Sequence, residues 1–345
     1  MMMTRSVHFK NTRKEFEKGV LYKLVLTACL LVTLVWVTQA WAQTDTRRVG
    51  VLSFATVADD PNVQVVLNLF RQKLASRGWI EGDNIAFEYA SARGDPFRFA
   101  EAALQLSRRK VDVIFATSAP ALRAAYAATH SIPIVAGDFT TDPVAEGYIQ
   151  SSARPGGNVT GIFLDAPEFA GKWFELLRAM IPDLSLVAVL WDPGAGTTHL
   201  QAVRNAAEVL ALQLQVIEVS KADEVPAAFA ALKDNTQAII FLPSPMIYNQ
   251  SARLASLALQ HRLPATSMAR EFALAGGTLA YGPERASTWE RSAVFVDRIL
   301  TGHDPAELPV ERPARIQLVV NLRTARVLGV TVPEAILLRA DEVVR

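Results

Sequence analysis

The chain has 345 residues, of which 50% are hydrophobic and 20% are charged, and its formal net charge is +1. This length can bury one or two substantial cores, and the balanced charge excludes the strongly basic surface that nucleic-acid binding needs. Cys29 is the only cysteine, and it lies in a leader-like stretch, residues 1–42. A chain that loses this stretch has no disulfide, no thiol nucleophile and no thiolate metal site.

Residues 1–42 are predicted to be a secretory signal peptide that is cleaved near Ala42. Six basic residues precede or border the uncharged run Leu24–Val37, and Ala40-Trp41-Ala42 has the small-x-small cleavage pattern. A membrane-spanning helix needs about 20 apolar residues, so retention as an anchor is the weaker alternative. Leu26–Cys29 resembles a lipoprotein box, but it lies inside the apolar run rather than after it. Without the leader the chain keeps 29 basic and 32 acidic residues, a net charge of −3.

From Arg48 onward, short apolar runs alternate with segments of helical periodicity. Strands are expected at Val49–Ser53, Ile85–Ser91, Val111–Ala116, Ile134–Gly137 and Val159–Phe163, and helices at about Pro61–Arg77, Pro96–Arg108 and Pro120–Thr129. Several of these strand-like runs are short and rich in β-branched residues, which is typical of strands that helices cover on both faces.

The second half of the chain repeats this alternation. Strands are expected at Val187–Trp191, Leu214–Val219, Ala238–Leu242, Ala265–Ser267, Thr278–Tyr281 and Ile316–Val320. Helices are expected at Pro167–Met180, Thr198–Ala211, Asp223–Lys233, Met246–His261, Pro283–Leu300 and Thr324–Leu328. Such alternation predicts an α/β fold, and roughly ten strands favour two doubly wound parallel-sheet lobes over one. Gly156-Gly157 and Gly276-Gly277 are candidate hinges, with ordinary turns as the alternative.

Motifs in a specific order also point to a known family. They are Val49–Leu52, Gly78–Ile85, Val111–Ile114, Ile132–Val135, Asp142–Val144, Arg154–Gly161, Val187–Trp191, Arg270–Phe272, Gly276-Gly277, Tyr281–Pro283, Asn321–Ala325 and Ala340–Val343. This series resembles a family of bacterial ABC-transporter substrate-binding proteins. Each motif alone is weakly specific, but their order and spacing extend from about Arg48 to Arg345.

The resemblance implies a type I periplasmic-binding-protein fold, with two lobes, a multi-crossing hinge and the solute in the cleft. The N-terminal lobe would comprise residues 47–162 plus 282–312, and the C-terminal lobe residues 163–281 plus 313–345. Some relatives bind aromatic amino acids. The sequence departs from the usual family pattern at Thr117–Pro120 and Gly137–Thr141, two segments that are expected beside the solute.

Candidate ligand-binding residues follow the strands of the first lobe, because ligands of doubly wound sheets bind beyond the carboxyl ends of the strands. Hydroxyl and N–H groups around Ser53, Thr117 and Ser118 suit a solute carboxylate, whereas Asp138 or Asp142 suits a solute ammonium group. Ser118 and Asp142 are equally suited to capping a helix or a turn. Phe54 and Phe139 could form an apolar wall or pack in the core.

The second lobe contributes further candidates. They are Trp191, Asp192, Ser244, Glu271, Phe272 and Tyr281. Trp191 could stack on a planar solute, although a tryptophan at a strand end more often packs in the core. Asp192 precedes a proline and has the pattern of a turn residue. Tyr281 is expected beside a hinge crossing, where an aromatic ring can line the cleft.

Enzymatic signals are sparse. The four histidines beyond the leader are scattered, and the nucleophile-elbow and phosphate-loop motifs are absent from the sequence. We therefore expect no catalytic residues, metal or cofactor. The favoured function is an exported periplasmic protein that binds a small solute, with an amino acid preferred, and delivers it to an ABC permease by hinge closure. A ligand-sensing protein for a membrane receptor and a secreted α/β enzyme are the alternatives.

Overall fold

The computed structural model describes residues 46–56, 61–139, 142–164 and 166–345. The chain divides after Thr46, and the fold is that of the unit Arg47–Arg345. The predicted signal peptide, its cleavage site and Cys29 lie outside the described residues. Within the described ranges, no helix has both the length and the hydropathy of a membrane span.

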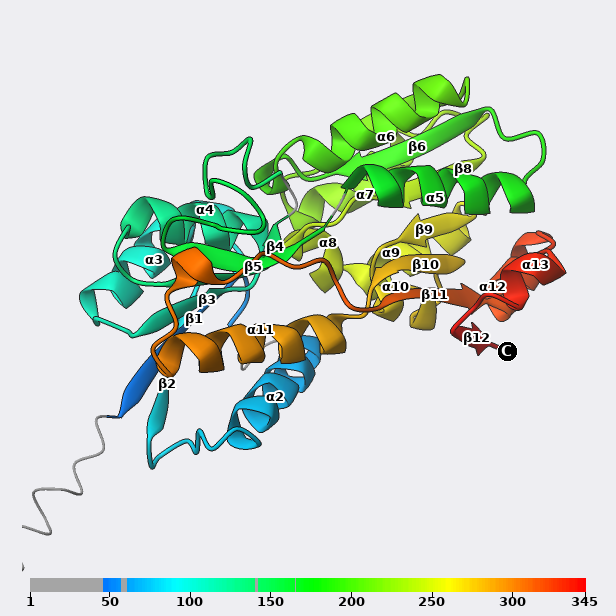
Figure 1. Cartoon of the computed structure of the whole chain (residues 1–345). Coiled ribbons are helices and arrows are strands. Elements are labelled where there is room, and N and C mark those ends of the chain that lie inside the picture. Colours follow the sequence, from blue (N-terminus) through cyan, green and yellow to red (C-terminus); the bar gives the residue numbers. More distant parts are fainter. Residues whose placement is uncertain (1–45, 57–60, 140–141, 165) are drawn as a thin grey trace, which may run out of the picture. The chain divides into compact units, whose positions relative to one another are not determined.

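The first sheet has five parallel strands in the order β2-β1-β3-β4-β5 (Figure 1). They are β1 (Arg47–Ser53), β2 (Ile85–Ser91), β3 (Val113–Ala116), β4 (Ile134–Phe139) and β5 (Val159–Phe163). Helices α3 (Phe99–Arg108) and α4 (Ala119–Ala128) cover one face, and α2 (Pro61–Ala75) covers the other together with α11 (Arg285–Leu300). The sheet is therefore doubly wound, as its alternating pattern predicts.

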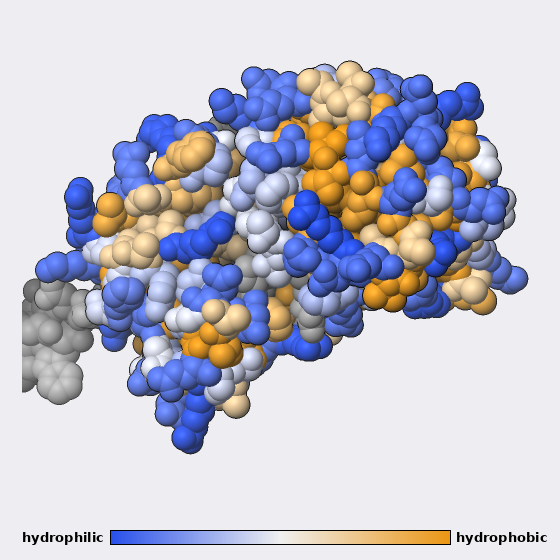
Figure 2. Space-filling model, turned by 90° about the horizontal axis from the view of Figure 1, so that it is seen from above, coloured by the Kyte–Doolittle hydropathy of each residue, from blue (hydrophilic) through white to orange (hydrophobic). Residues whose placement is uncertain are grey.

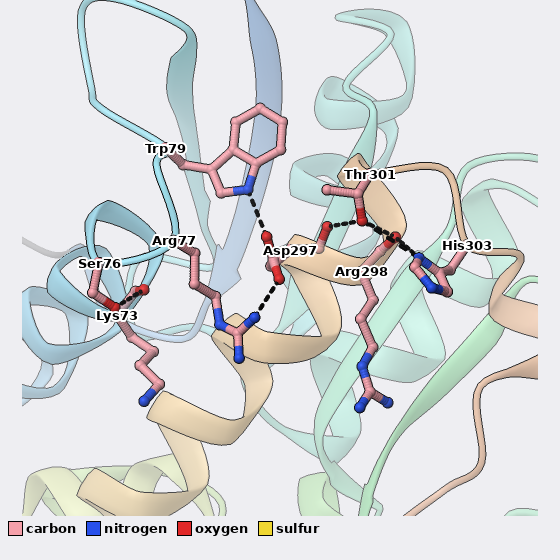
Figure 3. Close-up of polar contacts among 8 residues, drawn as sticks. All are labelled: Lys73, Ser76, Arg77, Trp79, Asp297, Arg298, Thr301 and His303. Carbon is pink, nitrogen blue, oxygen red and sulfur yellow. Dashed lines mark hydrogen bonds and ion pairs between the residues drawn. The ribbon is translucent and has the colours of Figure 1, made fainter.

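Helix α11 packs on one face of the first sheet, although it lies more than 100 residues after the last strand of that sheet in the sequence. Its Asp297 carboxylate accepts hydrogen bonds from Trp79 Nε1 at 2.9 Å and from the Arg77 guanidinium at 2.7 Å (Figure 3). Trp289, on the same helix, packs edge-on against Phe115 of β3, with ring centroids 5.0 Å apart. Long-range apolar and polar contacts thus fix α11 on the first sheet.

The second sheet has seven strands in the order β12-β11-β10-β9-β8-β6-β7. They are β6 (Leu186–Trp191), β7 (Gln213–Glu218), β8 (Ala238–Phe241), β9 (Ala265–Ser267), β10 (Leu279–Pro283), β11 (Ile316–Asn321) and β12 (Glu342–Val344). Helices α5 (Ala166–Met180) and α6 (Thr198–Val209) cover one face. The other face is covered by α7 (Val225–Ala230), α8 (Pro245–Asn249), α9 (Ser251–Gln260) and α10 (Arg270–Leu274).

Short elements complete the described chain. Four are 3₁₀ turns, η2 (Pro96–Arg98), η3 (Pro193–Ala195), η4 (Ala222–Glu224) and η5 (Pro305–Glu307), and two are helices near the C-terminus, α12 (Leu322–Leu328) and α13 (Glu334–Leu337). In the view of Figure 2, hydrophobic residues reach the surface mainly over the part of the chain that forms the second sheet, and hydrophilic residues surround them.

The two sheets, each covered by helices on both faces, confirm the predicted α/β class with two doubly wound lobes. Three connections join these sheets. They lie between β5 and α5, between β10 and α11, and between η5 and β11. The β10–α11 and η5–β11 connections run beside each other, and a hydrogen bond from the Glu284 N–H to the Arg315 carbonyl, 3.0 Å long, links them. The exact boundaries of the lobes stay predictions.

The structure corrects two expectations about these connections. The Gly-Gly pairs are not at the crossings: Gly156-Gly157 and Gly276-Gly277 form turns before β5 and β10, whereas the crossings follow the far ends of these strands. The second sheet is also not wholly parallel, since β10 and β11 pair antiparallel. β10 ends at one crossing and β11 begins after the neighbouring one, so the two strands must run in opposite directions.

Candidate functional site

A cavity of about 110 Å³ lies beyond the carboxyl ends of strands from both sheets. On the first-sheet side it is lined by the residues that follow β1 and β3 and by the end of β4. On the second-sheet side it is lined by the residues that follow β8. The start of α11, which follows the connection after β10, completes the wall. Sequence reasoning placed Ser53, Phe54, Thr117, Ser118, Asp138 and Ser244 in a ligand site, and all six line this cavity.

Two hydroxyl groups on the first-sheet side are already engaged within the protein. Ser53 donates to the Ala55 carbonyl at 2.8 Å, and Thr117 Oγ1 donates to the Leu52 carbonyl at 3.0 Å. These bonds hold the chain where it leaves β1 and β3. Each hydroxyl oxygen keeps lone pairs for a solute donor, but its proton is committed.

Ser118 is available to a solute. It occupies the N-cap of α4 with an extended backbone, yet its side chain does not make the capping hydrogen bond. Its Oγ is buried, and no described residue is within hydrogen-bonding reach of it. The N–H groups in the first turn of a helix also lack partners within the helix and favour an anion. Ser118 and the start of α4 therefore suit a carboxylate.

Asp138 is directed by an irregularity in β4. Ala136 pairs with Gly161 and Phe139 with Phe163, so β4 carries one extra residue between these two pairs. Such a bulge re-aims side chains and is frequent beside binding sites. Glycine is needed at position 137, because a Cβ atom there would lie only 2.9 Å from the Phe115 ring and would clash with it. The bulge thus brings Asp138 to the cavity.

Asp138 as a whole is half-buried, but its Oδ1 atom is buried and has no hydrogen-bond partner among the described residues. Burial raises the pKa of Asp138 to about 7. A buried carboxylate without a cation is costly, so the neutral form is favoured until a positive group arrives. Asp138 therefore suits a solute ammonium group.

The residues after β8 add Ser244 and Tyr248 to the cavity wall, and the start of α11 adds Arg285. Ser244 Oγ accepts from the Ile247 N–H at 3.1 Å and caps α8. The Arg285 guanidinium lies 5.7 Å from the centre of the Tyr248 ring and 3.4 Å from Glu271 Oε1. Glu271 itself does not line the cavity, and its contact with the site is indirect, through Arg285.

Two further predicted residues, Asp142 and Trp191, do not line the cavity. Asp142 is exposed and accepts hydrogen bonds from the N–H groups of Val144 and Ala145, as a turn residue does. Trp191 packs against the core under α5 and α6 and donates from Nε1 to the Gly196 carbonyl at 2.8 Å. Trp191 therefore packs in the core and Asp142 stabilises a turn, which are the structural roles that the sequence offered as alternatives to ligand binding.

Two other aromatic candidates belong to the core of the second sheet. Phe272 is buried against Phe241, with ring centroids 5.2 Å apart. Tyr281 is half-buried beside Phe169, and its carbonyl accepts from Trp173 Nε1 at 2.9 Å. Neither residue reaches the cavity. Phe139 stays a prediction, because its side chain is not among those described.

Asp192 lines a second, larger groove at the mouth of the cleft, of about 980 Å³. Its carboxylate accepts from the Gly194 N–H at 2.8 Å and caps η3. Burial raises the pKa of Asp192, while hydrogen bonds from Ser244 and the Gly194 N–H and the charge of Arg123 oppose this shift. Across the same groove, Arg123 of α4 donates to the Gly194 carbonyl at 2.7 Å. This bond joins the first-sheet side to the second.

Sequence reasoning did not find Tyr248, Arg285 and Trp289, which all line the cavity. Tyr248 lies in the first turns of a helix that begins at the proline after Ser244, and Arg285 and Trp289 begin the helix that follows Pro283. A search of the first two turns after each strand end, rather than of the strand end alone, would have included them. Among the described residues, no group of His, Cys, Asp or Glu side chains is arranged to hold a metal ion.

Comparisons with known proteins agree with this architecture. A family model described as ABC transporter substrate binding protein matches residues 51–344. A "Tyrosine-binding protein" of Clostridioides difficile is 23% identical over 290 residues, which cover 83% of each chain.

Two solved structures share the fold, each with a TM-score of 0.79. One is a conserved domain protein of Vibrio cholerae, 26% identical, with 86% of this chain and 99% of that chain covered. The other is an ABC domain of Streptococcus pneumoniae in complex with L-Trp, 22% identical, with 87% and 100% covered.

Proposed function

The chain belongs to the family of ABC transporter substrate-binding proteins, and on this premise we propose that it captures a free amino acid for an ABC importer. The family consists of solute-binding proteins rather than enzymes. In this proposal the protein acts in the periplasm, where the leader-like residues 1–42 would direct it, and passes its solute to a permease in the inner membrane.

The observation that carries the proposal is a pair of polar groups in one cavity that have no hydrogen-bond partner among the described residues. Ser118 Oγ, at the start of α4, offers a hydrogen-bond donor beside free helix N–H groups, and Asp138 Oδ1 offers an acceptor. The first suits a carboxylate and the second an ammonium group. An α-amino acid carries both groups one carbon apart, so it would satisfy both at once.

The rest of the cavity wall is largely apolar and would contact the side chain of the solute. Phe54, Leu164, Tyr248 and Trp289 line it together with four prolines. An apolar or aromatic side chain would be favoured there over a charged one, because burying it costs no unpaired polar group. The names of the Clostridioides difficile and Streptococcus pneumoniae relatives, which refer to tyrosine and tryptophan, support an aromatic amino acid.

We expect the two lobes to close around the bound solute, and the permease would recognise this closed form. The cavity takes residues from both sheets, so a bound solute bridges them and stabilises the closed arrangement. The Arg123–Gly194 hydrogen bond across the cleft adds a direct contact between the two sides.

A thermal-shift screen of the purified protein against the twenty L-amino acids tests the proposal. A true solute at 100 times its dissociation constant adds about 2.7 kcal/mol of stability and raises Tm by roughly 5 °C. One amino acid or a related group should produce such a shift, whereas sugars and dicarboxylates of equal concentration should not. A screen in which no amino acid changes Tm, followed by calorimetry without binding heat, contradicts the proposal.

A further inference from the structure

We propose that Asp138 is protonated in the empty cavity and gives up this proton when a solute ammonium group binds, so that capture of each solute releases one proton. This inference rests on the proposed function, because it requires a solute with a cationic amine. It adds a chemical step to that function: solute binding would release a proton, and the binding equilibrium would depend on pH through one side chain.

The geometry around Asp138 provides the first support. The β4 bulge directs this side chain to the cavity, where Oδ1 is buried without a described partner. The flanking strands β3 and β5 carry no titratable side chain that could neutralise it. An ionised carboxylate here would leave Oδ1 desolvated and without a partner among the described residues, which is unfavourable.

The charged groups on the helices around the cavity are already occupied. On α11, Arg285 faces Glu271 at 3.4 Å and the ring of Tyr248. On α4, Arg123 is directed to the Gly194 carbonyl. Tyr248 of α8 cannot supply a positive charge, and its own pKa is raised by burial and by Asp138. Among the described residues no cationic side chain pairs with Asp138 Oδ1, so in this inference the cation comes from the solute.

The direction of the pH effect follows from the two states of Asp138. Burial alone raises its pKa to about 7, so the empty protein holds the proton below that pH. A bound ammonium group favours the ionised form, so the proton leaves on binding. Protons then compete with the solute at acidic pH: affinity should fall by a factor approaching ten for each pH unit below about 6 and be nearly constant from about pH 8 to 9.

Isothermal titration calorimetry tests the inference. L-Tryptophan, L-tyrosine and L-leucine would be titrated at pH 6 and pH 8, each in two buffers of different ionisation enthalpy, which yields the number of protons released. We expect about one proton per solute at pH 6 and nearly none at pH 8. The matched deaminated acids, indole-3-propionate, 3-(4-hydroxyphenyl)propionate and 4-methylpentanoate, should bind more weakly and release none.

Two variants assign the proton. Asp138→Asn keeps the size of the side chain and an acceptor oxygen but cannot ionise, so any remaining binding should release no proton and lose its pH dependence between pH 5 and 7. Asp304→Asn removes a carboxylate that caps η5, and the proton count should stay that of the wild type. Circular dichroism and Tm would establish that both variants are folded.

The possible failures are distinguishable. Binding of an amino acid at pH 6 without proton release, or with release that persists in Asp138→Asn, overturns this inference and leaves the proposed function intact. Tighter binding of a deaminated acid than of its amino acid also overturns it. If neither the twenty amino acids nor the simple amines ethanolamine and putrescine bind, the proposed solute class fails and this inference fails with it.

Discussion

Two serines, Ser244 and Ser118, begin helices beside the cavity, and only the Ser244 hydroxyl caps its helix. Ser244 Oγ accepts from the Ile247 N–H and completes the cap of α8, whereas Ser118 Oγ makes no such bond at the start of α4. A cap residue that leaves its own helix uncapped is free to contact a solute. The same residue type therefore has a structural role at one strand end and is available for binding at the other.

This contrast gives a paired prediction. Ser118→Ala should lower the affinity for the amino acid found in the screen about fivefold, since one hydrogen bond contributes about 1 kcal/mol, and should change unfolding free energy by less than about 0.5 kcal/mol. Ser244→Ala should instead lower stability by about 1 kcal/mol. Calorimetry and urea unfolding measure the two effects, and equal destabilisation by both substitutions would contradict the assignment.

The sequence predicted the strand-end positions of the cavity better than its side chains. Ser53, Thr117, Ser118, Asp138 and Ser244 were found because the carboxyl ends of parallel strands meet at one edge of a sheet. Asp142 and Phe272 carry suitable chemistry, but they lie in a turn and in the core. The bulge that directs Asp138 depends on contact between β4 and Phe115, a tertiary feature that no local pattern contains.

At the scale of elements, α11 depends on polar contacts as well as on its apolar face. Asp297 is almost wholly buried, and it accepts hydrogen bonds from Arg77 and Trp79 in the segment after α2. These bonds bring together residues more than 200 positions apart in the chain. Because α11 also carries Arg285 and Trp289, its position on the first sheet determines part of the cavity wall.

We predict that Asp297→Ala lowers the free energy of unfolding by about 2 kcal/mol. The substitution leaves Trp79 Nε1 and the Arg77 guanidinium without their acceptor, and lost partners of this kind cost about 1–3 kcal/mol. Urea unfolding at pH 7 provides the measurement. Arg298→Ala, at the next position of α11, should change stability by less than about 0.5 kcal/mol. A loss as small in Asp297→Ala as in this control would contradict the role of Asp297.

Helices and strands were predicted well where the hydrophobic periodicity of the sequence was clear. They were predicted less well where their bounds or pairing depend on contacts with distant parts of the chain. The expected helix Met246–His261 is two helices, α8 and α9, which meet at Gln250. The strand β12 was not expected, because three residues carry too little periodicity to indicate a strand. The antiparallel pairing of β10 and β11 follows from the return of the chain through the third connection, which a local sequence window does not reveal.

At the scale of the whole molecule, the cleft is held by contacts between its two sides as well as by the connections. Arg123 on the first-sheet side donates to the Gly194 carbonyl on the second-sheet side. Such a contact exists only when the sides are close, so it favours the closed state selectively. The solute and this arginine would therefore shift the same equilibrium.

Arg123→Ala should weaken solute binding about fivefold, which corresponds to the loss of about 1 kcal/mol from the closed state. Most of the change is expected in the dissociation rate, because the contact forms after the solute has entered. Stopped-flow fluorescence of the cavity tryptophan, Trp289, can follow both rates. Arg204→Ala, an exposed arginine on α6, provides the charge-matched control. Unchanged dissociation in Arg123→Ala would exclude this role.

The late position of α11 has a consequence for biosynthesis. This helix covers one face of the first sheet, yet it follows strands β6 to β10 of the second sheet in the chain. A growing polypeptide therefore cannot complete its N-terminal core until residues 285–300 have left the ribosome. Up to that moment only α2 covers Phe115 and its apolar neighbours on this face, and the contact with Trp289 is missing. Such a delay leaves the first lobe incompletely packed while the strands of the second sheet are still being synthesised.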